Sequence, residues 1–325
     1  MKQKKLAQIL GVSTATVSKV FSGSKEISEE TKNKIIKTAK KYGVYNKFLN
    51  KKKKDRTIVI IVPEIISEYY SKIITLLCAE IKKYGYLPLI TLTDFSIQAE
   101  KKLLNYYTTN GRADGIINIS AKASITSIPS VPISILGGIK SIYCDNFYID
   151  AKSGIFEAVK TLKNYGHTRI AFIGENNTKR KIHFFKEALK FYNLEIDDSL
   201  IITSTLRFED AGYNAVNKLL KLNPLPTAII SAYDYIAIGA IKHLKEKGFS
   251  VPKDFSVIGN DDISISASSE FSLSSIHVNF KEASKIITES LIQKIENPKF
   301  ATNKDILIKT LLVKRNSIKN LKKEQ

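Results

Sequence analysis

The amino-acid sequence predicts two parts of different fold class, a small all-helical module at the N-terminus and a larger, doubly wound α/β core. In residues 1–56 the apolar residues have helical spacing, and sixteen Lys and Arg stand against four Asp and Glu. After residue 56, continuous apolar runs alternate with helical patterns. Continuous runs are typical of strands that are buried on both faces, so we expect parallel sheets covered by helices.

Composition and charge limit the function classes that fit the chain. The 325 residues are 43% hydrophobic and carry a formal net charge of +20. This composition excludes wholesale disorder, and the charge favours a polyanion such as nucleic acid as the partner. No apolar run reaches the roughly eighteen residues that a membrane span needs, and the N-terminus has no apolar signal segment. We therefore expect a cytoplasmic protein without a membrane partner.

The N-terminal module is expected to begin with two short helices joined by a tight turn. Leu6, Ala7 and Leu10 form one apolar face, and Gly11 suits the left-handed conformation that ends a helix. Ser13 is suited to cap the second helix. A third amphipathic helix follows and completes the module.

The second helix, expected over residues 14–21, has an inner and an outer face. Val17, Val20 and Phe21 face inward in the predicted helix. The residues expected to contact DNA, at base edges or along the backbone, are Ser13, Thr14, Ala15, Thr16, Ser18 and Lys19. A recognition helix presents its first two turns to base edges in this way. Helical periodicity alone fits any small three-helix domain with solvated lysines equally well.

The α/β core is expected to follow the charged stretch at residues 51–56, which reads as a linker. The clearest strands are predicted at residues 57–62, 87–92, 115–119, 131–136, 169–173, 228–231 and 256–258. Helical patterns lie between them at residues 69–84, 154–165, 211–222 and 236–247. Ligands of such folds bind outside the carboxyl ends of the strands, so contacts are expected in the segments just after strands.

Several segments of the sequence resemble those of a known protein family. Residues 6–20, followed by Ile27-Ser28-Glu29-Glu30-Thr31, closely resemble the headpiece of the LacI/GalR (lactose-repressor) family of bacterial regulators. The likeness continues through Val62-Pro63-Glu64-Ile65, residues 113–117, 166–174 and 251–259, and Asp261-Asp262. These landmarks stand in the family's order, and together they form a strong signal.

The resemblance implies a helix-turn-helix headpiece and a periplasmic-binding-protein-like core of two Rossmann-like subdomains. Headpiece and hinge would occupy residues 1–56, the core 57–318 and a basic tail 319–325. One subdomain would hold about 57–162 and 278–304, and the other about 163–277 and 305–318.

The function implied is that of a sequence-specific DNA-binding regulator, expected to be a repressor. A homodimer would bind a pseudopalindromic operator in double-stranded DNA, and a small molecule, a sugar or sugar derivative, would bind between the subdomains. Control by a protein corepressor, or repression without a ligand, is the alternative. A solute-binding protein and a sugar-acting enzyme are less favoured, because the signal segment and the catalytic motifs are missing.

The same resemblance implies an effector site. The candidate residues are Tyr69, Tyr70, Asp150, Lys181, Phe208, Asp234, Asp261 and Phe280. Each has a structural alternative: Asp150, Asp234 and Asp261 suit caps, the aromatic residues suit core packing, and Lys181 belongs to a basic run that could be a solvated face.

The hinge departs from the family's pattern, because residues 44–51 lack the usual proline and are short. Leu49 is the candidate for the leucine that the family inserts into the minor groove. No metal site, cofactor or catalytic residue is expected, since the four histidines are scattered and Cys78 and Cys144 have no ligand spacing.

Overall fold

The computed structural model describes residues 2–21, 24, 26–44, 56–109, 112–297 and 302–323. The chain divides into a small unit of residues 1–57 with 85–87 and a large unit of residues 58–84 and 88–325. We call the described part of residues 2–44 the headpiece and the large unit the core. Predicted residue Leu49 lies outside the described residues.

Three helices form the headpiece, as the apolar spacing predicts. They are α1 (Gln3–Leu10), α2 (Thr14–Phe21) and α3 (Glu29–Lys41). Leu6, Val17, Ile35 and Ala39 are at most 1% exposed and pack together at their centre. Gly11 ends α1 with a φ of 64°, a left-handed conformation that costs a glycine little, so α2 can start after a short turn.

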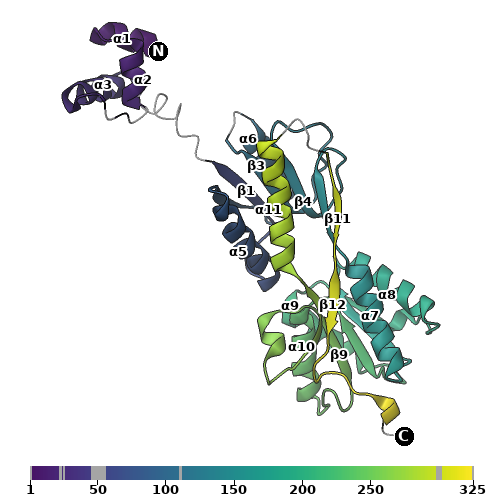
Figure 1. Ribbon diagram of the computed structural model, residues 1–325. Helices are drawn as coiled ribbons and strands as arrows, with labels where there is room; N and C mark the ends of the chain where they lie inside the picture. Colours follow the sequence, from purple (N-terminus) through teal and green to yellow (C-terminus); the bar gives the residue numbers. More distant parts are fainter. Residues whose placement is uncertain are drawn as a thin grey trace. The chain divides into compact units, whose positions relative to one another are not determined.

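The core contains two six-stranded sheets, which Figure 1 shows as two subdomains. The first has the order β11-β5-β4-β3-β1-β2, and the second has the order β12-β10-β9-β8-β6-β7. The strands of the first sheet are β1 (Thr57–Val62), β2 (Leu87–Leu92), β3 (Gly115–Ala121), β4 (Ile133–Gly138), β5 (Asp145–Ile149) and β11 (Asp305–Ile308). Those of the second are β6 (Ile170–Glu175), β7 (Ile201–Ser204), β8 (Ala228–Ser231), β9 (Ser256–Asp261), β10 (Ser274–Val278) and β12 (Thr310–Val313).

Pairing in both sheets is mainly parallel, as the continuous apolar strands predict. Ile58 of β1 lies opposite Gly115 of β3, and Ile170 of β6 lies opposite Ala228 of β8. An antiparallel pair joins β10 to β12. A parallel sheet buries both faces, which explains why five of the six residues of β1 are buried.

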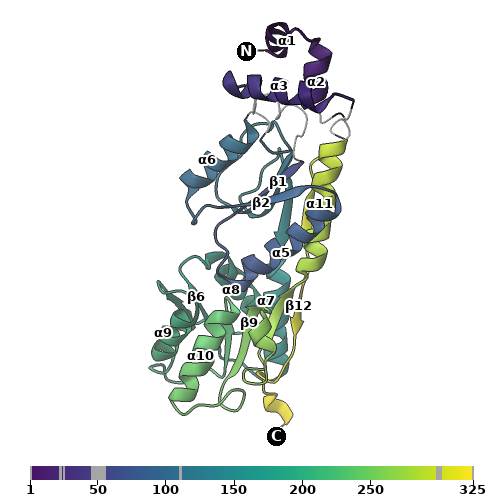
Figure 2. The ribbon, with the colours of Figure 1, turned by 90° about the vertical axis from the view of Figure 1, so that its left-hand side faces the viewer.

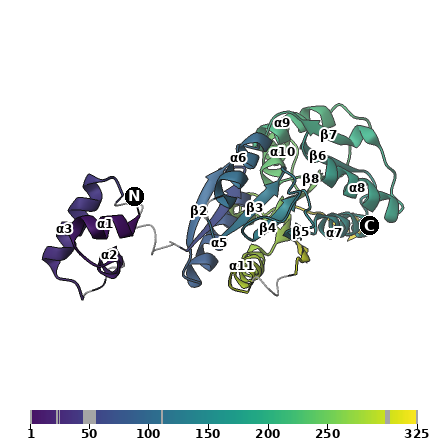
Figure 3. The ribbon, with the colours of Figure 1, turned by 90° about the horizontal axis from the view of Figure 1, so that it is seen from above.

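Helices cover both faces of each sheet. In the first subdomain α5 (Glu68–Lys83) packs beside α11 (Phe280–Glu296) on one face, and α6 (Ile97–Thr108) lies on the other (Figure 2). In the second, α9 (Phe208–Leu219) and α10 (Asp234–Glu246) cover one face, while α7 (Ala151–Asn164) and α8 (Lys179–Phe191) cover the other (Figure 3). Within the described residues, no helix has the length and apolar character that a bilayer crossing requires.

The chain passes between the subdomains three times, and two of these crossings differ from the predicted boundaries. The first lies near Asp150 instead of residue 162, because α7 buries Ile155 and Val159 in the core of the second sheet. The last lies at Lys309 instead of residue 304, because β11 pairs with β5 in the first sheet. The second crossing follows Val278, one residue after the predicted boundary.

Candidate functional site

A cavity of about 280 Å³ lies in the core, and residues of both subdomains line it. Its walls include Glu64, which follows β1, and Ser120 near the end of β3. From the second subdomain come Glu175 at the end of β6 and Asp261 at the end of β9. Strands of parallel sheets expose their carboxyl ends at one edge, so the segments just after strands converge here as the sequence predicts.

Five of the eight predicted effector residues line this cavity. They are Tyr69, Tyr70, Lys181, Phe208 and Asp261. The two tyrosines begin α5, and their rings meet edge to face with centroids 5.1 Å apart. The Tyr70 hydroxyl lies 3.0 Å from Ser120 Oγ, so a hydrogen bond joins α5 to the end of β3. The arrangement gives the cavity an aromatic wall with a polar rim.

Asp261 and Lys181 add two ionisable side chains to the cavity lining. Burial raises the pKa of the Asp261 carboxyl to about 7, although Lys181 opposes this shift, and nearby Asp234 adds to it. Burial lowers the pKa of Lys181, against the attraction of Asp261. The Lys181 ammonium donates a hydrogen bond of 2.6 Å to the Ala232 carbonyl and lies 4.3 Å from the ring centroid of Tyr233.

Three predicted residues lie outside the cavity lining, and each has a structural contact instead. Asp150 caps α7, since its carboxylate accepts a hydrogen bond of 3.1 Å from the Ser153 amide. Phe280 is 2% exposed and packs edge to face against Tyr69, with ring centroids 5.0 Å apart, so it supports the aromatic wall from behind. Asp234 is fully buried.

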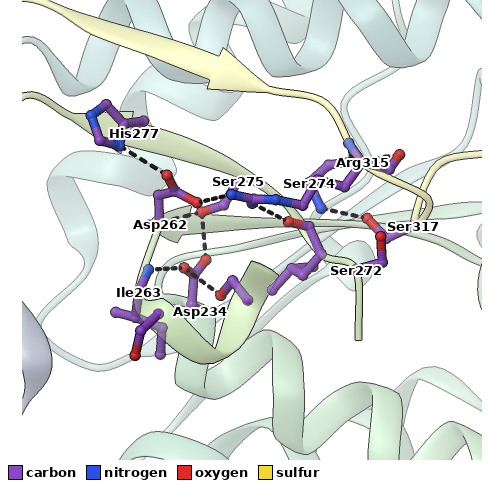
Figure 4. A network of polar contacts seen from close by, with 12 residues as sticks. Asp234, Asp262, Ile263, Ser272, Ser274, Ser275, His277, Arg315 and Ser317 are labelled. Atoms are coloured by element: carbon purple, nitrogen blue, oxygen red, sulfur yellow. Dashed lines mark hydrogen bonds and ion pairs between the residues drawn. The ribbon is translucent and has the colours of Figure 1, made fainter. Parts of the chain in front are cut away.

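The carboxylate oxygens of Asp234 accept hydrogen bonds from other residues of the second subdomain (Figure 4). Its carboxylate accepts from the Ser275 hydroxyl at 2.6 Å, the Ser266 hydroxyl at 2.8 Å and the Ile263 amide at 2.9 Å. These bonds tie the start of α10 to β10 and to the loop after β9. An aspartate after a strand carries the same sequence pattern whether it faces a ligand or its own loop.

The neighbouring Asp262 also holds the fold together in Figure 4. Its carboxylate lies 2.7 Å from Arg315 Nη2 and 2.9 Å from His277 Nδ1. Arg315 follows β12, so the network fastens the last strand segment to β9 and β10.

Sequence reasoning missed an ion pair at the cavity. Arg207 donates two hydrogen bonds to the Glu64 carboxylate, at 3.1 and 3.2 Å, in a bidentate pair. Glu64 belongs to the first subdomain and Arg207 to the second, so the pair joins the two. A second carboxylate, that of Glu175, lies 3.9 Å from Arg207 Nε and accepts a hydrogen bond of 3.0 Å from the Phe208 amide.

A weak signal for this pair existed in the sequence. Glu64 stands in one of the family landmarks directly after a strand. Arg207 follows the short strand β7, which has only four residues and a polar end. Because the sequence analysis does not predict this strand, no sequence signal placed Arg207 near the cavity.

The headpiece presents most of the predicted DNA-contact residues on its surface. Ser13, Thr14, Ala15 and Lys19 are exposed, and Thr16 and Ser18 are half-buried. The Ser13 hydroxyl accepts from the Thr16 amide at 3.0 Å, which is the predicted cap of α2. The outer face of α2 therefore has the exposed polar side chains and the capped start that the sequence predicts.

Comparison with known proteins places these features in a family. Residues 4–45 match the bacterial regulatory proteins of the lacI family, and residues 159–318 match a periplasmic binding protein-like domain. The HTH-type transcriptional repressor CytR of Escherichia coli strain K12 is 30% identical in an alignment over 267 residues that covers 78% of this chain and 78% of CytR.

Two solved structures share the fold. The lac repressor dimer bound to operator and the anti-inducer ONPF has a TM-score of 0.74 at 20% identity and covers 98% of each chain. A LacI family transcriptional regulator from Enterococcus faecium with bound ribose has a TM-score of 0.70 at 23% identity, covering 82% of this chain and 100% of that one. The periplasmic-binding-protein-like architecture of the core is thereby confirmed.

Proposed function

Because the chain belongs to the lacI family of bacterial regulatory proteins, we propose that it is a sequence-specific DNA-binding repressor controlled by a small molecule. The observation that carries this proposal is that one chain has both an exposed outer face on α2 and a core cavity lined by residues of two subdomains. The cavity suits a ligand, and a ligand that bridges two subdomains can change their arrangement. Such a regulator acts in the cytoplasm, where its DNA lies.

On DNA, α2 would enter the major groove. Thr14, Ala15, Ser18 and Lys19 would face base edges, while Ser13 and Thr16 would contact the backbone. Leu49 is proposed to insert into the minor groove at the operator centre. Two headpieces of a homodimer would read the two halves of a pseudopalindrome.

The first subdomain offers a surface for this homodimer. Strand β2 stands at the edge of its sheet, and Leu89, Ile90 and Leu92 are each 40–43% exposed. An exposed apolar strand at a sheet edge is a liability for a monomer, and a second copy of the chain would cover it. Ile90→Lys should therefore shift the sedimentation coefficient from dimer to monomer, whereas Ile128→Lys, outside this strand at a residue that is 83% exposed, should not.

The cavity would take a small polyhydroxylated ligand such as a sugar. Tyr69 and Tyr70 supply aromatic faces, and Asp261 supplies acceptors for ligand hydroxyl groups. The Enterococcus faecium regulator with bound ribose supports a sugar as the ligand class. Phe208 and Lys181 would complete the contacts.

Selection of genomic fragments by the full-length protein tests the proposal. Enrichment of one short palindrome is expected, and a screen of sugars should find a compound that raises the melting temperature. If palindromes are enriched and no sugar binds, control by a protein corepressor becomes the better account. If no sequence is enriched, the DNA-binding proposal fails.

A further inference from the structure

The headpiece carries an ion pair formed by Lys19, a residue that the proposed function assigns to DNA contact. Lys19 lies in the last turn of α2, and its ammonium is 2.5 Å from a carboxylate oxygen of Glu26, in the turn before α3. The two side chains are 51% and 68% exposed, so neither belongs to the headpiece core. Exposed pairs of this kind contribute little to folding stability, so we consider a role of this pair in recognition of DNA bases.

A carboxylate beside a recognition helix faces a chemical problem. The hydrogen bond and charge of Lys19 hold the pKa of Glu26 below its usual value, so the group is ionised at neutral pH. An ionised carboxylate is an acceptor only, and DNA phosphates repel it. Its available partners in the major groove are the amino groups of cytosine N4 and adenine N6.

The ammonium of Lys19 has the complementary capacity. An ammonium group has three N–H donors, so one that holds a carboxylate is also able to donate to a base. Guanine offers two adjacent acceptors, N7 and O6, and its partner cytosine offers the N4 donor next to them. A G·C pair thus offers adjacent acceptors to the lysine and a donor to the glutamate. In an A·T pair, by contrast, a donor separates the two acceptors.

We propose that Lys19 and Glu26 act as one unit that reads a single G·C base pair in each half-site. The inference rests on the proposed DNA-binding function and adds a specificity-determining residue outside the recognition helix. Lys19 donates to guanine, and Glu26 accepts from cytosine N4 while it fixes the direction of the lysine. Without Glu26, the flexible lysine side chain reaches other acceptors, including phosphates and thymine O4.

Selection from a randomised operator library with the full-length protein tests this unit. Wild type should prefer G·C by roughly tenfold or more at one symmetric position. Glu26→Ala should reduce that preference several-fold at this position alone and make the dependence of log affinity on log salt steeper by about one, as Lys19 turns to a phosphate. Glu26→Gln should gain tolerance for A·T, because an amide pairs with adenine.

Glu29→Ala is the matched control. Glu29 lies in the same module and forms a 2.9 Å ion pair with Lys32, so its removal changes the net charge equally. It should raise affinity for all sequences alike and leave the base preferences unchanged. Circular dichroism of each variant verifies the fold.

The outcomes separate the two hypotheses. If wild type enriches no palindrome, the proposed function fails. If wild type enriches a palindrome and Glu26→Ala has the same base preferences as Glu29→Ala, the reading unit is overturned and Glu26 has no role in specificity.

Discussion

Buried titratable groups decide how the core responds to pH. Asp261 lines the cavity, where burial raises its pKa from 3.8 to about 7, while Lys181 opposes the shift. His167 is 1% exposed and holds the C-terminal segment of the chain in place. Its ring contacts the Thr227 hydroxyl at 2.9 Å and the Lys319 carbonyl at 3.0 Å. Asp261 therefore belongs to the cavity, whereas His167 holds the fold together. Their contributions to the stability of the core change with pH in opposite directions.

Asp261 should make the core less stable as the pH rises. Because its folded pKa lies above the ordinary value of 3.8, the folded state binds the proton more tightly. That contribution is fully present below pH 3.8 and is lost as the pH rises through about 7. Asp261→Asn should then gain about 1–3 kcal/mol over wild type at pH 8 and less at pH 5. Melting temperatures across this range test it, and parallel curves for the two proteins would refute it.

His167 should have the opposite effect. Burial lowers its pKa below 6.5, although the bond to the Lys319 carbonyl opposes this. The neutral ring stabilises the fold fully above pH 6.5, and this contribution is lost as the pH falls below that value. His167→Gln should cost about 1–2 kcal/mol at pH 7.5 and flatten the loss of stability between pH 6.5 and 5. An equal slope in denaturant titrations of both proteins would exclude His167 as the titrating group.

At the scale of elements, polar bonds join the two subdomains around the cavity. Arg207, just before α9, holds Glu64 after β1. Glu68 at the start of α5 accepts from the Ser264 amide and hydroxyl, both at 2.7 Å. Both contacts connect the segments that follow strands of different sheets. They stabilise the arrangement in which the cavity walls face each other.

Glu64→Gln should loosen this arrangement. The variant loses the ion pair but keeps the side-chain volume, and the Arg207 charge stays partly buried without its partner, at a cost of about 1–3 kcal/mol. Small-angle X-ray scattering should show a larger radius of gyration. Glu209→Gln is the control, because it breaks a 2.6 Å pair with Lys242 inside the second subdomain. Should both variants have the wild-type radius, the pair has no part in holding the subdomains together.

The elements show why some features were predictable from the sequence and others were not. Strands β1, β2 and β8 have the predicted bounds, because their apolar runs end sharply. Helix α7 was assigned to the wrong subdomain, because helical periodicity shows which face is apolar and not which sheet it covers. Glu64 and Arg207 lie 143 residues apart, and only the crossings of the chain bring them together.

On the scale of the whole molecule, the headpiece and the core are separate units with separate chemistry. The headpiece supplies exposed polar and charged side chains on α2, and the core supplies a cavity lined from two subdomains. Neither unit alone explains a regulator. A ligand influences DNA binding only if it binds one arrangement of the core more tightly than the other, and the difference in affinity limits the effect.

This requirement gives a quantitative prediction for a sugar that raises the melting temperature. If saturating sugar changes operator affinity by a given factor, bound operator must change sugar affinity by the same factor, typically about 5- to 150-fold. Fluorescence anisotropy measures the first and isothermal titration calorimetry the second. Asp261→Ala removes acceptors for the ligand and should abolish both shifts together. A sugar that binds equally well with and without operator, yet changes operator affinity, would have to act at a site other than this cavity. A sugar that binds the cavity and changes neither affinity would leave the cleft uncoupled from DNA, and a protein corepressor would then be the regulator to seek.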